Sequence, residues 1–267
     1  STSFFGSMIR STPATHPAKP HDIWMDAHCH LSDDGFDADR DAIYAELVEN
    51  GVKGLVLAGT EPRDWGKQSA LAPPPELKIA RVFGMHPWWV DDYGDEELKA
   101  AMRELKAALA VCDGLGELGL DYFRAKSEDA REKQRHWFLE QLALVRDRPE
   151  LPLVLHMVRS HHEALPLLRK ERRTFRGLVH AFWANSEIAK AYTELGFLLS
   201  IPPRILKEDP HQLLAIDPEL IVFETDTPFI DAEGQRVRPA YIREMLEGVA
   251  KLRGEDGQDV APTGAVF

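Results

Sequence analysis

The chain has 267 residues, of which 44% are hydrophobic and 28% are charged, and this composition is typical of a globular protein with a large core. The net charge of −12 excludes a broad surface that coats nucleic acid, because such binding depends on Lys and Arg, but it permits a small phosphate pocket. No apolar run approaches the roughly 18 residues of a membrane helix, and two cysteines, Cys29 and Cys112, are too few for a disulfide framework, so we expect no membrane association and a cytoplasmic location.

Along the chain, strand-like apolar runs alternate with amphipathic segments of helical spacing. We expect a flexible N-terminal tail over residues 1–21, one domain over 22–254, and a C-terminal tail over 255–267. The strand-like runs are 23–30, 52–60, 78–87, 113–122, 151–158, 176–182, 196–202 and 219–228. Eight such repeats in one α/β domain predict a closed (β/α)8 TIM barrel, with an open doubly wound sheet as the structural alternative.

The strand-like runs end in histidines and acidic residues. In "DAHCH", alternation along a strand places Asp26, His28 and His30 on one face. Five later runs add polar residues at their ends, namely His86, Glu117, Asp121, His156, His180, Glu224 and Asp226. One histidine at the end of an apolar run is more often a hydrogen-bonded structural residue than a ligand. Because the carboxyl ends of barrel strands meet at one mouth, the whole set predicts a metal site there.

The chemistry of this set restricts the metal. Imidazoles and carboxylates without thiolates suit Zn, Mn, Mg or Fe, and more than four ligands indicate two ions that share a carboxylate. We therefore predict a binuclear centre.

Six motifs carry a family resemblance. "DAHCHL", "GMHPWW", "GELGLDY", "LVLHMVRSH", "HAFWANSEIAKAYTELGFLLSI" and "ETDTPF" resemble, in order and spacing, the motifs of the TatD-related metal-dependent hydrolases, a branch of the amidohydrolase superfamily. The resemblance extends from about residue 24 to 229. It implies a TIM barrel, two divalent metal ions (Mg, Mn or Zn) and hydrolysis of phosphodiester bonds, usually by a DNase.

The same resemblance implies a set of metal ligands. One ion would be bound by His28, His30, Glu117 and Asp226. The second ion would be bound by Glu117, His156 and His180, so that Glu117 would bridge the two ions.

The expected mechanism uses a metal-activated water molecule. Asp226 would orient this water and accept its proton, Glu117 would hold both ions, and Arg159 would help to stabilise charge on the phosphoryl oxygens. The residues expected to contact substrate are His86, Trp88, Arg124 and Arg159. Trp88 could stack on a base or sugar and the arginines could clamp a phosphate, whereas a packed aromatic ring and a solvated arginine are the ordinary alternatives. His161 and His162, at the start of a helix, are expected to be solvated.

Other functions are compatible with parts of the sequence. "GLGELG" (114–119) matches the dinucleotide fingerprint only formally, because Glu117 inside it would repel a pyrophosphate. We predict a monomer that acts on DNA or another phosphodiester. The alternatives are a metal-dependent amidohydrolase or deacylase that cleaves a C–N or carboxylic ester bond, and a barrel that keeps its metals as a non-enzymatic scaffold.

Overall fold

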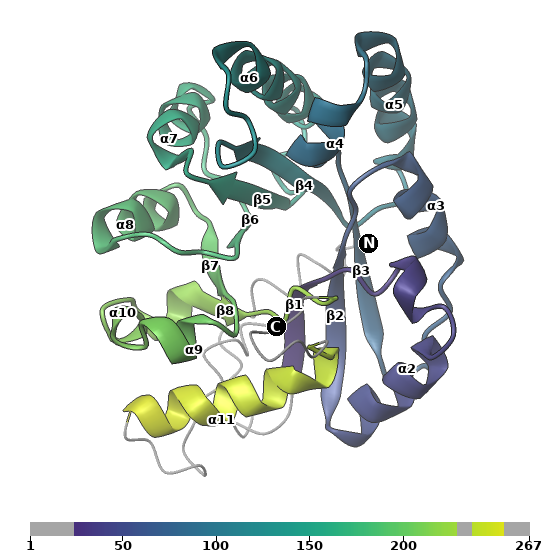
Figure 1. The fold of residues 1–267 in the computed structure, drawn as a ribbon, viewed down its shortest axis with the longest axis vertical. Coiled ribbons are helices and arrows are strands. Elements are labelled where there is room, and N and C mark those ends of the chain that lie inside the picture. The colour runs from purple at the N-terminus through teal and green to yellow at the C-terminus, as the bar shows by residue number, and fades with distance from the viewer. Residues whose placement is uncertain (1–23, 229–236, 254–267) are drawn as a thin grey trace.

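The computed structural model describes residues 24–228 and 237–253, so the two expected tails lie outside the described residues. The described strands form one eight-stranded sheet in which each strand pairs in parallel with the next one in the chain. They are β1 (Trp24–Cys29), β2 (Val52–Ala58), β3 (Lys78–Phe83), β4 (Gly114–Asp121), β5 (Leu153–Val158), β6 (Gly177–His180), β7 (Leu198–Ile201) and β8 (Ile221–Phe223). Figure 1 shows these strands around a common centre.

The sheet closes where β8 returns to β1. The amide of Asp226 donates to the carbonyl of His28 at 3.0 Å, and the amide of His30 donates to the carbonyl of Thr227 at 2.8 Å. The amide of Thr225 donates to the buried carboxylate of Asp26 at 3.0 Å. The predicted TIM barrel is confirmed, and the open doubly wound sheet is wrong, because strands of that fold do not pair in chain order around a closed ring.

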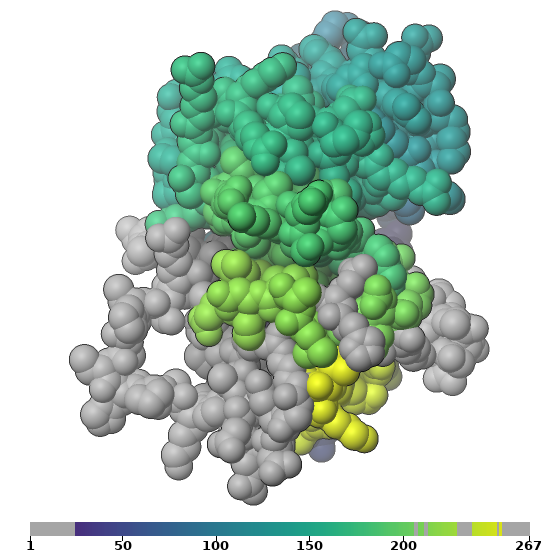
Figure 2. Space-filling view, turned by 90° about the vertical axis from the view of Figure 1, so that its left-hand side faces the viewer, coloured from purple at the N-terminus to yellow at the C-terminus, as the bar shows by residue number. Residues whose placement is uncertain are grey.

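Helices surround the strands (Figure 1). They are α2 (Arg40–Glu49), α3 (Pro62–Ala70), α4 (Pro87–Asp92), α5 (Asp95–Ala108), α6 (Glu128–Ala143), α7 (His161–Lys170), α8 (Ser186–Glu194), α9 (Ile205–Glu208), α10 (His211–Leu214) and α11 (Ile242–Arg253), with the short 3-10 turns η1 (Asp34–Phe36), η2 (Pro218–Leu220) and η3 (Pro239–Tyr241). Figure 2 shows that segments from the second half of the chain lie one after another on this side of the molecule, from teal at the top to yellow at the bottom. No helix in the described part of the chain is long and apolar enough to cross a membrane.

Two layers of buried apolar side chains support the barrel. Along β5, Leu153 and Leu155 belong to the large core shared with the helices, whereas Val154 belongs to a smaller cluster with Leu178 and Val222. Because successive strand residues point to opposite faces, this smaller cluster fills the inside of the barrel. On β5, β6 and β8 the inward face therefore continues, two residues further along the chain, to His156, His180 and Glu224 at the mouth.

The strands end earlier than the sequence predicts. β8 ends at Phe223, although the apolar run was expected to continue to residue 228, and β3 ends at Phe83 rather than at residue 87. Asp226 has φ of 52°, a left-handed conformation that no strand residue adopts. The last polar groups of these runs are thus displayed on the loops that follow the strands.

Candidate active site

Six predicted ligands meet at the carboxyl end of the barrel, and Glu117 of β4 is at their centre. Its Oε1 lies 2.7 Å from His156 Nδ1 and 3.2 Å from His180 Nε2. Its Oε2 lies 3.4 Å from His28 Nε2 and 3.6 Å from His30 Nε2. Each carboxylate oxygen of this buried residue therefore faces its own pair of histidines.

The close approach of β4 to β5 depends on a glycine. A Cβ atom at Gly119 would lie 1.8 Å from the carbonyl oxygen of His156, the residue with which Gly119 pairs in the sheet. Only glycine allows the two backbones to approach so closely at this level of the barrel.

Asp226 completes the cluster from the loop after β8. Its Oδ1 lies 3.6 Å from His28 Nε2 and 3.5 Å from His30 Nε2, and 31% of its side chain is exposed. Glu117 is only 2% exposed. Burial raises the pKa of both carboxyl groups, but the surrounding histidines, with His180 the largest contributor, outweigh burial and hold each pKa below its usual value. Both groups are therefore carboxylates that attract a cation.

In each of three histidines, one ring nitrogen lies within hydrogen-bond distance of an acceptor, and the other ring nitrogen faces Glu117. His30 Nδ1 lies 3.0 Å from the carbonyl of Ala58, which can only accept, so the proton of the neutral ring is on Nδ1. His156 Nε2 lies 3.3 Å from Asp121 Oδ2, which also only accepts, so the proton of that neutral ring is on Nε2. Burial lowers the pKa of His30 and of His156, but hydrogen bonds to Asp226 and to Asp121, together with the charge of Glu117, outweigh burial and raise the two pKa values to about 10 and about 9. A metal ion would displace the proton from the nitrogen that faces Glu117 and leave the other nitrogen on its acceptor, which is the usual arrangement of a metal-ligating histidine.

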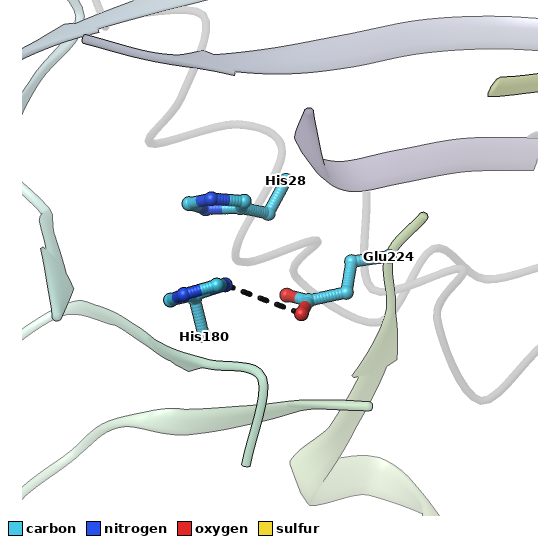
Figure 3. A group of neighbouring side chains, drawn as sticks. All are labelled: His28, His180 and Glu224. Atoms are coloured by element: carbon cyan, nitrogen blue, oxygen red, sulfur yellow. Dashed lines mark hydrogen bonds and ion pairs between the residues drawn. The ribbon is translucent and has the colours of Figure 1, made fainter. Parts of the chain in front are cut away.

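The third of these histidines is His180, which Figure 3 shows with His28 and Glu224. His180 Nδ1 lies 3.2 Å from Glu224 Oε1, and its ring stacks on that of His28 at 3.9 Å between centroids. Glu224 Oε1 also accepts a hydrogen bond from the amide of Ala181 at 2.7 Å. Glu224 thus orients His180.

The sequence analysis assigned no role to Glu224 or Asp121 beyond their place at strand ends. In both cases the spacing along the strand indicated that the side chain faces inward. Glu224 is two residues from Val222 on the inward face, and Asp121 follows Glu117 on β4.

His86 differs from the other histidines. Its Nδ1 accepts a hydrogen bond from the amide of Trp88 at 3.1 Å, so the proton of the neutral ring is on Nε2. That nitrogen lies 3.3 Å from Glu117 Oε1, to which it can donate. Burial lowers the pKa of His86 to about 4 and keeps the ring neutral. His86 was expected to contact substrate, and its position fits a donor that orients Glu117 better than it fits a metal ligand.

The donor set fits a divalent metal ion. Three groups of side chains have ligand atoms within 4.8 Å of one another, and the groups are His28, His180 and Glu224; His28, His30 and Glu117; and His86, Glu117 and His156. Glu117 Oε2 and His28 Nδ1 are buried and have no hydrogen-bond partner among the described residues. Buried polar atoms normally have a partner, and a bound cation would supply one to the carboxylate oxygen.

A cavity of about 560 Å³ opens above this cluster, and Trp88 and Arg124 line it as expected for substrate contacts. Trp88 is 47% exposed, and its indole nitrogen donates to Asp121 Oδ2 at 2.5 Å. The Arg124 guanidinium lies 5.4 Å from the Trp88 ring and pairs with Asp92 at 2.6 Å. Trp88 belongs to α4, which lies beside β4 in Figure 1, and Arg124 belongs to the loop after β4.

Arg159 was expected at the reacting phosphate, but it does not line the cavity. Its backbone is left-handed, with φ of 54°, and its guanidinium lies 4.8 Å above the exposed ring of Phe123. The turn directly after β5 thus directs this side chain away from the ligands. The solvated position expected for His161 is also wrong, because its Nδ1 lies 3.1 Å from the hydroxyl of Tyr192 and burial lowers its pKa to about 4.

Known proteins resemble this chain over most of its length. Deoxyribonuclease TATDN3 from Homo sapiens is 28% identical over 249 residues, which cover 88% of this chain and 89% of that protein. The 3'-5' ssDNA/RNA exonuclease TatD from Escherichia fergusonii is 28% identical over 262 residues, covering 90% and 95%. The crystal structure of the TatD homologue YjjV from Escherichia coli matches with a TM-score of 0.76 at 24% identity, covering 91% of this chain and 97% of that one.

The sequence profile of a single family covers the barrel. The profile described as TatD related DNase matches residues 25–264, which include all six proposed metal ligands. The chain therefore belongs to the TatD related DNase family.

Proposed function

We propose that this protein is a divalent-metal-dependent phosphodiesterase that cleaves nucleic acid, most simply a deoxyribonuclease. The observation that carries the proposal is the convergence of four histidines and two carboxylates around Glu117, in a family whose named relatives include a deoxyribonuclease and an ssDNA/RNA exonuclease. The ring nitrogens that face Glu117 support the same conclusion, because hydrogen-bonded structural histidines do not need to share one carboxylate.

Two ions that share Glu117 are the proposed cofactor. The two oxygens of Glu117 face different histidine pairs, His28 with His30 and His156 with His180, so each oxygen can serve one ion. Asp226 approaches only the first pair. When bound, such ions lower the pKa of water and neutralise charge on a phosphoryl group.

The side chains divide the remaining work. Asp226 and Glu117 both line the cavity, but the side chain of Asp226 is 31% exposed and that of Glu117 only 2%, so the ionised Asp226 is the better placed to accept the proton of the attacking water. Arg124 is placed to bind a phosphate, and Trp88 to stack on a base or sugar beside it. Arg159, whose guanidinium lies over Phe123 and which does not line the cavity, is given no part in this step.

Chelation and reconstitution test the proposal. The protein is treated with EDTA, dialysed, and assayed with Mg, Mn or Zn on single-stranded DNA, duplex DNA and bis(p-nitrophenyl) phosphate, with an amide and a lactone as competing substrate classes. We expect phosphodiester hydrolysis to disappear with the metal and to return on its addition. Full activity of the metal-free protein, or turnover of the amide or lactone alone, would refute the proposal.

The cellular setting is part of the proposal. We propose a cytoplasmic monomer with one domain over residues 22–254. One chain supplies every proposed ligand, and both cysteines, Cys29 and Cys112, are free thiols, as a reducing compartment would leave them.

A further inference from the structure

Outside the cavity, the loop after β4 carries a second aromatic ring with cations around it. Phe123 is 55% exposed, although a ring of this size is ordinarily buried. Lys126 Nζ lies 4.4 Å from its centroid, and the guanidinium of Arg159 lies 4.8 Å away. Neither cation forms an ion pair with any residue that the structure describes, in a chain whose net charge is −12. The proposed mechanism leaves all three residues without a role.

One buried carboxylate connects this ring to the cavity. Asp121 Oδ1 accepts hydrogen bonds from the amides of Phe123 at 2.9 Å and Arg124 at 3.0 Å, while its Oδ2 accepts from the indole of Trp88. The same Oδ2 lies 3.3 Å from His156. The backbone of Phe123 is thus fixed relative to the proposed metal ligands, and Phe123 is the chain neighbour of Arg124, which lines the cavity.

Arg159 occupies an unusual backbone position. Its φ of 54° lies in the left-handed region that glycine and asparagine adopt most readily, yet the residue there is a long cation over the Phe123 ring. Structural needs of the turn alone would favour a small residue. The arginine is better explained by what it does at the surface.

We propose that Phe123, Lys126 and Arg159 form a second nucleotide subsite, which binds the part of a single-stranded nucleic acid that extends out of the cavity. The assignment deepens the function proposed above and rests on it. An unpaired base can stack on Phe123, and the cations, which are held to an exposed ring only weakly, can turn to the adjacent phosphates. In a duplex the bases are already stacked on one another, so the subsite selects a single strand.

Catalysis on substrates of different length tests the subsite. The metal-loaded protein is assayed with oligodeoxythymidylates of two and eight nucleotides and with bis(p-nitrophenyl) phosphate, which is too small to reach Phe123. We expect Phe123→Ala to lower kcat/KM on the octamer about 10-fold through KM, as loss of one stacked base does, and to leave the small ester unchanged. Phe123→Trp should retain the activity of the parent protein.

A binding measurement tests the subsite without requiring hydrolysis. Anisotropy of a labelled dT8 is measured with the full chain in EDTA across a salt series. Arg159→Gln should weaken binding and reduce the slope of log K against log salt by about 0.7, the value for one phosphate contact to a single strand. Arg103→Gln, which makes the same charge change on the exposed face of α5, is the matched control and should change neither quantity.

Several outcomes would overturn the subsite. Equal loss of activity on the octamer and on the small ester would show that Phe123 only supports the loop. Unchanged octamer binding by Phe123→Ala, or tighter binding of a duplex than of dT8, would exclude a stacked single strand. If the protein hydrolyses no phosphodiester, the proposed function is wrong. The anisotropy measurement then still shows whether the subsite binds nucleic acid.

Discussion

The inside of this barrel holds two adjacent layers that differ in chemistry although the same strands build them. Val154, Leu178 and Val222 form part of an apolar layer in which every side chain is satisfied by packing alone. Two residues further along the same three strands are His156, His180 and Glu224, which are equally buried. In the second layer a buried carboxylate oxygen and a buried imidazole nitrogen have no partner among the described residues. The fold is stabilised by the first layer, and the second layer carries a polar cost that a bound cation can offset.

The largest effect is expected at Glu117, where every proposed ligand pair meets. Glu117→Gln keeps the shape of the side chain but removes the charge that both histidine pairs face, so metal affinity should fall at least 100-fold, the upper end for loss of a supporting partner. Phosphodiester hydrolysis should fall with it. Metal content after dialysis, measured by elemental analysis, and turnover check this expectation. Glu187→Gln on the exposed start of α8 is the control, and a Glu117→Gln protein with full metal content would show that Glu117 does not hold the metal.

Asp226→Asn should have the next largest effect. The substitution preserves size and removes the basicity of the more exposed of the two proposed ligand carboxylates, so kcat should fall about 10²-fold or more, as on loss of a general base. KM should change much less, because Arg124 and Trp88 remain. A residue that only caps the turn after β8 would instead cost about 1 kcal/mol of stability and leave kcat intact. The turnover number and Tm of this variant distinguish the two roles.

The apolar layer should respond in the opposite way. Val154→Ala removes two buried methyl groups and should lower the free energy of unfolding by about 2 kcal/mol through lost burial and a cavity. Metal content and turnover should be nearly unchanged at a temperature where the variant is folded. Urea unfolding and elemental analysis of the same preparation test this separation. Loss of metal without loss of stability would mean that the two layers are not independent.

The smallest effect concerns His161, a half-buried histidine outside the mouth. Burial, with a smaller contribution from His162, lowers its pKa from 6.5 to about 4. The unfolded chain therefore binds a proton at higher pH than the folded one, and stability falls as pH drops from about 6.5 to 4. After allowance for its partial exposure, His161 should account for about 2 kcal/mol of that loss. Urea unfolding of His161→Asn at pH 7 and pH 4.5 should show a shallower pH dependence than that of the parent, and equal slopes would contradict the assignment.

The sequence by itself determined the barrel and the residues at its mouth. Eight apolar runs that alternate with amphipathic segments indicate parallel strands, and their number favours a closed ring over an open sheet. Since side chains alternate along a strand, residues such as His156 and His180 could be placed on the inward face without coordinates. Parallel strands end at one edge, and for this reason the residues after different strands could be expected to meet.

Only the tertiary structure decided how each polar group is used. Which nitrogen of His86 or His180 carries the proton depends on neighbours such as the Trp88 amide and Glu224. Likewise, the left-handed turn that directs Arg159 to Phe123 rather than into the cavity leaves no mark in residue spacing. Periodicity reports the face of a strand, but it stops where the strand stops. Beyond that point the direction of a side chain depends on backbone dihedrals and on contacts between loops distant in sequence, which only the folded chain defines.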